Sequence, residues 1–196
     1  MKLRAAKSIH GEDLSKILIQ NWIREKASFI KAIYKSEDLV LLTIMGGGLF
    51  LTVDFCRSLI GDSEDESPFK SITVESVKCS SYLAAPEGGG EMVAGLDFQI
   101  HHTLTANNIE GRVVVVIDDI IDTGRTMHAV IDLAASLGAK CVTPLALLYK
   151  PSKRLTHYTF EEDEILKGVP VEGYVVGYGL DSNGRYRERN RIYWLG

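Results

Sequence analysis

The chain has 196 residues and a formal net charge of −4 at pH 7, and its hydrophobic fraction of 45% is typical of one globular domain. The acidic balance argues against a nucleic-acid partner, which demands a basic face, and no apolar run reaches the roughly 20 residues of a membrane helix. Three widely spaced cysteines offer no disulfide framework, so we expect a cytoplasmic protein with reduced thiols and with neither a membrane nor a nucleic-acid partner.

The first part of the chain alternates helical and strand-like patterns. Residues 11–35 carry apolar side chains at helical spacing and predict one or two amphipathic helices. Residues 39–44 have the length and composition of a buried strand, and residues 49–59 have the pattern of a helix. The three consecutive glycines at 46–48 lie between them, and glycines let backbone N–H groups approach an anion closely. These residues predict a unit of strand, glycine loop and helix.

A strand and a second glycine-rich stretch follow. Residues 72–79 alternate apolar and polar side chains, as a half-buried strand does. Residues 83–94 contain Pro86 and three consecutive glycines, so they predict a mobile loop, after which residues 95–103 return as a strand.

The most informative stretch comes next in the chain. Residues 113–117 are four valines and an isoleucine, typical of a strand buried on both faces. Asp118 and Asp119 follow at its carboxyl end, where open α/β sheets bind their ligands. Residues 122–126, Asp-Thr-Gly-Arg-Thr, then lead into a helical pattern, and the N–H groups and dipole of a helix N-terminus favour a phosphate. Carboxylates beside such a turn fit a ligand that also carries hydroxyls and a divalent cation, as a sugar phosphate with Mg²⁺ does.

The last part of the chain completes an α/β pattern. Residues 141–149 predict another buried strand, which ends at Lys150, and residues 174–178 and 191–194 predict two short strands. Strands that alternate with helices indicate a mainly parallel sheet with right-handed crossovers. A dinucleotide-binding fold would need a GxGxxG motif and a P-loop would need GK[ST], and the chain has neither.

The ordered Asp-Asp-x-x-Asp-Thr-Gly-x-Thr of residues 118–126 resembles the phosphoribosyl-pyrophosphate (PRPP) signature of the type I phosphoribosyltransferases. From about residue 38 onward the chain looks most like their 6-oxopurine branch, the hypoxanthine-guanine phosphoribosyltransferases. The resemblance implies one type I phosphoribosyltransferase domain over residues 1–196, with a mainly parallel sheet flanked by helices. Its core would span about 36–150, and a small hood would come from about 1–35 and 151–196. It also implies a homodimer or homotetramer, to which the N-terminal helices could contribute.

The resemblance assigns a PRPP site and a metal. The residues that it places against PRPP are Gly46, Gly47, Asp118, Asp119, Thr123, Gly124, Arg125, Thr126 and Arg187. It implies Mg²⁺ as the cofactor, held with the help of the carboxylates of Asp181, Asp118 and Asp119. The family often has a basic residue where this chain has Met45, and it has a cis peptide that would fall between Ile44 and Met45.

The resemblance also assigns the purine site, the catalytic base and a lid. Lys150 would read the purine 6-oxo group, because an ammonium only donates hydrogen bonds. Tyr174 would stack on the base, and main-chain groups near Val175 and Asp181 would meet the ring edge. Asp122 would remove the proton from purine N7 as N9 attacks C1′ of the ribose.

Ser81 and Tyr82, at the start of the second glycine-rich stretch, resemble the residues of the family that close over the site and exclude water. The expected reaction joins PRPP to hypoxanthine or guanine and releases pyrophosphate. Two alternatives stay open. One is a xanthine-preferring phosphoribosyltransferase. The other is a regulatory RNA-binding protein that keeps the PRPP fold, because Arg125 with its neighbours resembles the Gly-Arg-Thr of that group. The adenine-using branch usually lacks an acid at the position of Asp122.

Overall fold

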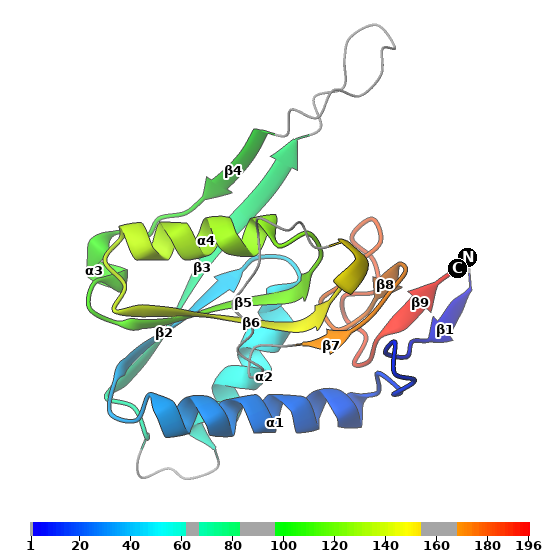
Figure 1. Cartoon of the computed structure of the whole chain (residues 1–196), viewed down its shortest axis with the longest axis horizontal. Coiled ribbons are helices and arrows are strands. Elements are labelled where there is room, and N and C mark those ends of the chain that lie inside the picture. The colour runs from blue at the N-terminus through cyan, green and yellow to red at the C-terminus, as the bar shows by residue number, and fades with distance from the viewer. Residues whose placement is uncertain (1, 62–66, 83–96, 154–167) are drawn as a thin grey trace, which may run out of the picture.

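A six-stranded sheet forms the centre of the computed structural model, which describes residues 2–61, 67–82, 97–153 and 168–196 (Figure 1). In chain order its strands are β2 (Asp38–Ile44), β3 (Ser71–Tyr82), β4 (Asp97–His101), β5 (Val113–Ile121), β6 (Cys141–Tyr149) and β7 (Val169–Pro170). Their spatial order is β4-β3-β2-β5-β6-β7, and every neighbouring pair is parallel except β3 with β4. The expected, mainly parallel α/β sheet is confirmed.

Helices cover both faces of this sheet, as Figure 1 shows. On one face lie α1 (Lys16–Ile33) and α2 (Gly48–Ile60), and on the other lie α4 (Arg125–Ser136) and the short α3 (Ala106–Ile109). Residues 11–35 therefore hold one helix, which begins after Ser15, whose hydroxyl accepts the N–H of Leu18 at 3.3 Å. Such a side-chain cap satisfies one of the N–H groups that a helix start leaves without a partner.

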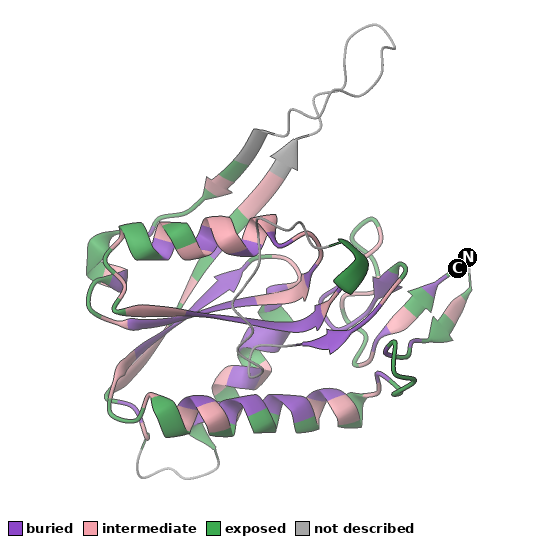
Figure 2. Cartoon of the chain, in the orientation of Figure 1, coloured by how far each residue is buried: buried purple, intermediate pink, exposed green. Residues whose placement is uncertain are grey.

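The apolar run at the start of β5 is explained by burial on two sides (Figure 2). Val113, Val115 and Ile117 pack with the cluster under α1 and α2, whereas Val114 and Val116 pack with the cluster under α4. All five are buried, because successive side chains of a strand point to opposite faces and both faces carry helices.

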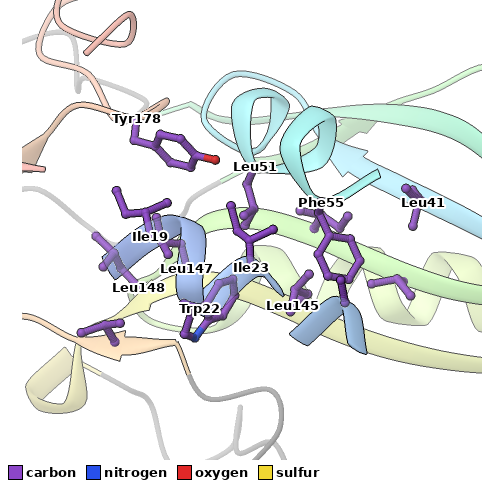
Figure 3. Packing of buried hydrophobic residues seen from close by; sticks show 14 of the residues in the cluster. Ile19, Trp22, Ile23, Leu41, Leu51, Phe55, Leu145, Leu147, Leu148 and Tyr178 are labelled. Carbon is purple, nitrogen blue, oxygen red and sulfur yellow. The ribbon is translucent and has the colours of Figure 1, made fainter. Parts of the chain in front are cut away.

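The layer between α1, α2 and the sheet is the larger of these two clusters. Figure 3 shows Ile23 of α1, Leu51 and Phe55 of α2, and Leu145 of β6 pointing into it. Leu51 and Phe55 have no exposed surface. Burial of such side chains fixes where α2 lies on the sheet, and therefore where the glycine loop before α2 lies.

The two ends of the chain share a second, three-stranded sheet of order β1-β9-β8. β1 (Leu3–Ala5) pairs with β9 (Tyr193–Leu195), which pairs with β8 (Val175–Val176), both antiparallel (Figure 1). β8 is shorter than the strand predicted over 174–178, because Gly177 and Tyr178 adopt positive φ angles of 103° and 51° that an extended strand does not allow. The boundaries of the expected core and hood stay a prediction.

Two further expectations concern loops and membranes. The expected mobile loop at 83–94 lies outside the described residues. Across the ranges given above, no helix is both long enough and apolar enough to cross a membrane.

Two leucines of α2 test the packing of this layer. Leu51 has no exposed surface and Leu49 is 43% exposed. Leu51→Ala should lower the free energy of unfolding by about 2–5 kcal/mol, because it removes buried methyl groups and leaves a cavity. Leu49→Ala, the matched control on the same helix, should change it by about 0.5 kcal/mol or less. Urea unfolding followed by circular dichroism measures both, and equal losses would contradict the placement of α2.

Candidate active site

The candidate site lies at the carboxyl ends of β2, β5 and β6. The three strands are parallel and in register, with Thr43 of β2 opposite Ile117 of β5, and Ile117 opposite Leu145 of β6. The carboxyl end of β5, which contains Asp118 and Asp119, therefore lies at the same edge of the sheet as the glycine loop at 46–48 after β2 and Lys150 after β6. This edge is where open α/β sheets bind ligands.

The glycine loop packs directly on the acidic end of β5. A Cβ built on Gly47 would overlap the carboxylate of Asp119, and one on Gly48 would lie 2.7 Å from the carbonyl oxygen of Ile117. Only glycines allow this approach. Behind the loop, the buried hydroxyl of Thr52 donates to the Gly48 carbonyl at 2.9 Å and ties the loop to the first turn of α2.

The peptide bonds of the described residues are all trans, so the cis bond expected between Ile44 and Met45 is not found. Met45 itself is 42% exposed and brings no charge to the loop. A cation reaches it instead from the C-terminal segment: a Cβ on Gly46 would lie 3.7 Å from Nη1 of Arg187. Arg187 therefore stands beside the loop where the resemblance expects pyrophosphate.

Arg187 also organises the C-terminal segment. Its guanidinium donates to the carbonyl oxygen of Gly179, and its Nη2 lies 2.6 Å from Oδ1 of Asp181. Gly179 packs on the glycine loop, because a Cβ there would overlap the carbonyl oxygen of Gly47. The loop, the acidic strand end and the C-terminal segment thus meet in one cluster.

Asp118 and Asp119 are partly buried carboxylates near the end of β5. Burial raises the pKa of Asp118 well above its ordinary value of 3.8, and the neighbouring charge of Asp119 raises it further. Burial also raises the pKa of Asp119, although a hydrogen bond with Asp118 and the positive charge of Arg187 oppose the rise. Oδ1 of Asp118 accepts the N–H of Asp119 at 2.9 Å. The pair would gain from a ligand that brings hydroxyl donors or a cation.

The phosphate turn predicted at 122–126 joins β5 to α4. Gly124 precedes the helix with φ +90°, a left-handed conformation that favours glycine, and α4 begins at Arg125. The Arg125 N–H donates to the Thr123 hydroxyl at 3.4 Å. The turn encloses a hollow of about 70 Å³ whose lining comprises Asp118, Ile120, Ile121, Asp122, Thr123, Gly124, Thr126 and Met127. Its position at a helix N-terminus suits an anion.

Asp122 faces two lysines. Its Oδ2 lies 3.5 Å from Nζ of Lys150 and 3.3 Å from Nζ of Lys153, whereas its Oδ1 is buried and has no hydrogen-bond partner among the described residues. Lys150 is itself buried, at 8% exposure, and its backbone N–H donates to the main-chain carbonyl of Ile121 at 2.9 Å. One carboxylate oxygen of Asp122 is therefore paired with two ammonium groups, and the other has no hydrogen-bond partner within the described part of the chain.

Lys153 was not predicted from the sequence. It ends the single 3₁₀ turn η1 (Pro151–Lys153) that follows Lys150. The signal that could have found it is the spacing Lys150-Pro-Ser-Lys153, because residues three apart on a 3₁₀ turn lie on the same side.

The predicted purine-binding residues lie beside this cluster. Tyr174 is 52% exposed, and its hydroxyl donates to the main-chain carbonyl of Asp181 at 2.9 Å. Val175 is buried in β8. The carboxylate of Asp181 is fully engaged, since Oδ1 pairs with Arg187 and Oδ2 accepts the N–H of Gly184 at 2.7 Å. A metal at Asp181 would have to compete with Arg187.

The described part of the chain has no group of three His, Cys, Asp or Glu side chains that could hold a metal on protein ligands alone. Mg²⁺ in phosphate chemistry is usually held by one or two carboxylates together with the phosphates of the substrate. Asp118 and Asp119 on one side and Asp181 on the other each offer carboxylate oxygens for that mode of binding, in which one or two carboxylates act together with substrate phosphates.

The lid residues lie farther along β3. Ser81 and Tyr82 are its last two residues, and their backbones pair with Phe98 and Asp97 of β4. The glycine-rich stretch after them falls outside the described residues. The lid and the other assigned roles remain predictions, although the structure brings most of the assigned residues to one edge of the sheet.

Gly47 and Asp119 form a pair that can be tested by mutation. Gly47→Ala should lower the free energy of unfolding by about 1–3 kcal/mol, because the new methyl group overlaps the Asp119 carboxylate. In an Asp119→Ala background the same change should cost less, by roughly the 0.5–3 kcal/mol of coupling typical of residues in contact. Urea unfolding of the two single variants and the double variant measures this, and additive losses would show that the two residues do not touch.

The pair of Asp118 and Asp119 also predicts how stability depends on pH. Because the folded-state pKa of Asp118 is raised, its favourable contribution is complete below the unfolded-state value of about 3.8 and is lost as pH rises through the folded-state pKa. Asp118→Asn removes this titration and keeps the acceptor for the Asp119 N–H. It should exceed the wild type in free energy of unfolding at neutral pH, and the difference should shrink toward about pH 4.

Urea unfolding across this pH range, with a chelator present to exclude divalent cations, measures the effect. Asp132→Asn, an exposed change on α4, is the control and should leave the pH profile unchanged. An Asp118→Asn variant less stable than the wild type at neutral pH would show that the folded protein stabilises the charged form.

Comparison with known proteins agrees with this geometry. A family described as the phosphoribosyl transferase domain matches residues 12–183. A hypoxanthine-guanine phosphoribosyltransferase of Staphylococcus epidermidis is 30% identical over 90% of both chains. The bifunctional protein TilS/HprT of Listeria innocua is 34% identical over 92% of this chain, which spans only 26% of that longer relative.

Solved structures give the same picture. The hypoxanthine phosphoribosyltransferase of Staphylococcus aureus superposes with a TM-score of 0.71 at 26% identity, over 93% of this chain and 89% of that one. The chain belongs to the phosphoribosyltransferase family and is similar to its hypoxanthine-guanine branch.

Proposed function

We propose that the protein transfers the 5-phosphoribosyl group of PRPP to N9 of a 6-oxopurine, hypoxanthine or guanine, and releases pyrophosphate. The products are the nucleoside monophosphates IMP or GMP, which makes this a purine-salvage reaction. The observation that carries the proposal is the pair formed by Asp122 and Lys150, with one carboxylate oxygen held by ammonium groups and the other buried and without a partner among the residues that the structure describes. The similarity to relatives named for this reaction supports it.

Recognition of the base would depend on Lys150 and Tyr174. An ammonium donates hydrogen bonds and accepts none, so Lys150 suits a 6-oxo group and opposes the 6-amino group of adenine. The half-exposed ring of Tyr174 offers a surface on which a purine can stack. The main chain near Val175 and Asp181 would complete the contact at the ring edge.

The chemical step needs a base for N7 and stabilisation of the leaving group. Asp122 would accept the N7 proton while the N9–C1′ bond forms and the bond from C1′ to the pyrophosphate oxygen breaks, with the bonding electrons leaving on pyrophosphate. The turn at 123–126 would hold the 5′-phosphate, and Asp118 and Asp119 would accept hydrogen bonds from the ribose hydroxyls. The loop at Gly46 and Gly47, with Arg187, would bind pyrophosphate.

Mg²⁺, when bound with PRPP, would neutralise charge on the departing pyrophosphate. Asp181, Asp118 and Asp119 are the residues we propose to hold it. Arg187, which is paired with Asp181, would supply the cationic contact to pyrophosphate. Ser81 and Tyr82 would close over the site and exclude water.

A homodimer or homotetramer remains a prediction, as does a cytoplasmic location, with which the free thiols of the three cysteines agree.

The proposal is tested by a spectrophotometric assay with PRPP and Mg²⁺, run separately on hypoxanthine, guanine, xanthine and adenine. Turnover of hypoxanthine or guanine with adenine inert is the expected result. A marked preference for xanthine would assign the other 6-oxopurine branch. Absence of turnover with every base would overturn the proposal, and a salt-sensitive affinity for RNA would then favour a regulatory protein.

Asp122→Asn should lower kcat by about 10²–10⁴-fold, because the amide cannot accept the N7 proton. The amide keeps an oxygen near Lys150, so binding of the base should change much less than kcat. Asp132→Asn, which changes an exposed carboxylate of α4 in the same way, should match the wild type. Steady-state kinetics separate the two parameters, and full activity of Asp122→Asn would show that another group takes the proton.

A further inference from the structure

A partly buried hydrogen bond links the two segments that would share pyrophosphate. The hydroxyl of Tyr178 donates to Oδ2 of Asp54 at 2.7 Å, across 124 positions of sequence. Asp54 lies in α2, the helix that begins at Gly48 directly after the glycine loop. Tyr178 lies in the C-terminal segment, between Tyr174 and Asp181. None of the roles assigned above includes either residue.

The ring of Tyr178 points inward although its backbone lies in a turn. The side chain is 7% exposed and belongs to the cluster under α1 and α2, and Figure 3 shows it directed toward α2, with its hydroxyl leading. Its φ of +51° is uncommon for a bulky residue and needs surroundings that hold it in place. Burial and the carboxylate of Asp54 raise the pKa of Tyr178 above its ordinary value of 10, so the hydroxyl keeps the proton that it donates.

The residue after Tyr178 makes the contact that the site depends on. Gly179 lies so close to Gly47 that no side chain fits there, and its carbonyl oxygen accepts from Arg187. The Tyr178 N–H donates to the Arg189 carbonyl at 2.8 Å, and the Gly179 N–H donates to the Arg187 carbonyl at 3.0 Å. The position of Arg187 is therefore set by a turn whose anchor is the Tyr178 side chain.

We propose that Asp54 and Tyr178 are positioning residues that hold the glycine loop and Arg187 in the arrangement that binds the pyrophosphate of PRPP. This inference rests on the proposed function, and it adds a role for residues outside the contact surface of the substrate. Gly47 caps the start of α2 and Asp54 lies in the middle of the helix, so α2 connects the two rigidly. The hydrogen bond then joins α2 to the turn at 177–181.

The test compares variants that remove the hydrogen bond; Asp54 also lies 3.9 Å from Nη1 of the exposed Arg57, so Tyr178→Phe is the cleaner of them. Tyr178→Phe keeps the ring and loses the hydroxyl, Asp54→Ala loses the acceptor, and Asp54→Asn keeps an amide oxygen that can accept. We expect Tyr178→Phe and Asp54→Ala each to raise KM for PRPP about tenfold, the factor that a hydrogen bond to a charged group commonly accounts for. kcat at saturating PRPP should stay close to wild type, the double variant should match the single ones, and Asp54→Asn should restore KM.

Tyr34→Phe is the matched control. The Tyr34 hydroxyl is also 2.7 Å from the hydroxyl of Thr143, and it accepts from Sγ of Cys141 at 3.3 Å. Both residues lie near the amino end of β6 and so at the opposite edge of the sheet. Its loss should leave KM for PRPP unchanged. A Tyr178→Phe variant with wild-type KM, whatever its melting temperature, would show that Tyr178 serves packing alone and would overturn the proposal.

A second measurement decides the proposal without turnover. Hydrogen–deuterium exchange should be faster in Tyr178→Phe than in the wild type at the amides of residues 46–48 and 177–181, with the melting temperature little changed. If the wild type turned over no purine, the proposed function would fail, while exchange together with PRPP affinity from calorimetry would still decide the role of the pair. Unchanged exchange in both segments would reject it.

Discussion

The contact between Gly47 and the carboxylate of Asp119 is the constraint on which the rest of the site depends. It brings a backbone loop against the end of a neighbouring strand with no room for a Cβ. The same glycine presents its carbonyl to Gly179, so three segments from distant parts of the sequence meet at one residue. The core under α2 supports this contact, because burial of Leu51 and Phe55 decides how far the helix and its preceding loop advance over the sheet.

The site also holds charge at a cost in stability. Burial disfavours the ionised forms of Asp118 and Asp119, and Arg187 offsets only part of that penalty at Asp119. Asp181 and Arg187 satisfy each other, and Asp122 is satisfied on one side by lysines. Such an arrangement is suited to a ligand that carries phosphates, hydroxyls and a cation together, since each component relieves a different imbalance.

Local patterns in the sequence predicted the longer strands and the contiguous motifs, because neighbouring residues determine both. Residues 141–149 form the predicted strand because a continuous apolar run is buried on both faces. β1 and β7 were missed because two or three residues cannot show a period, and β8 was predicted too long because the reversal at Gly177 and Tyr178 is a matter of backbone angle. The acidic stretch at 118–122 was found because its residues are contiguous.

Long-range contacts left no such signal. The approach of Lys153 to Asp122 needs the 3₁₀ turn after β6, and the bond between Asp54 and Tyr178 joins elements whose proximity follows only from the assembled layers. The resemblance assigned Arg187 to the PRPP site. Its ion pair with Asp181 and its position beside Gly46, however, follow from the turn geometry of the C-terminal segment.

The two-sided burial of β5 has a consequence for how the strand finds its partners. A strand with one polar face is held in register because a slip of one residue turns that face into the core. Residues 113–117 are apolar on both faces, so a slip within this run exchanges one apolar side chain for another. The residues at the end of the strand oppose such a slip. It would move Asp118 and Asp119 toward the apolar layers between the helices and the sheet, and Gly47 would lose its contact with the Asp119 carboxylate. The acidic residues proposed for the reaction thus also help to set the register of β5 in the sheet.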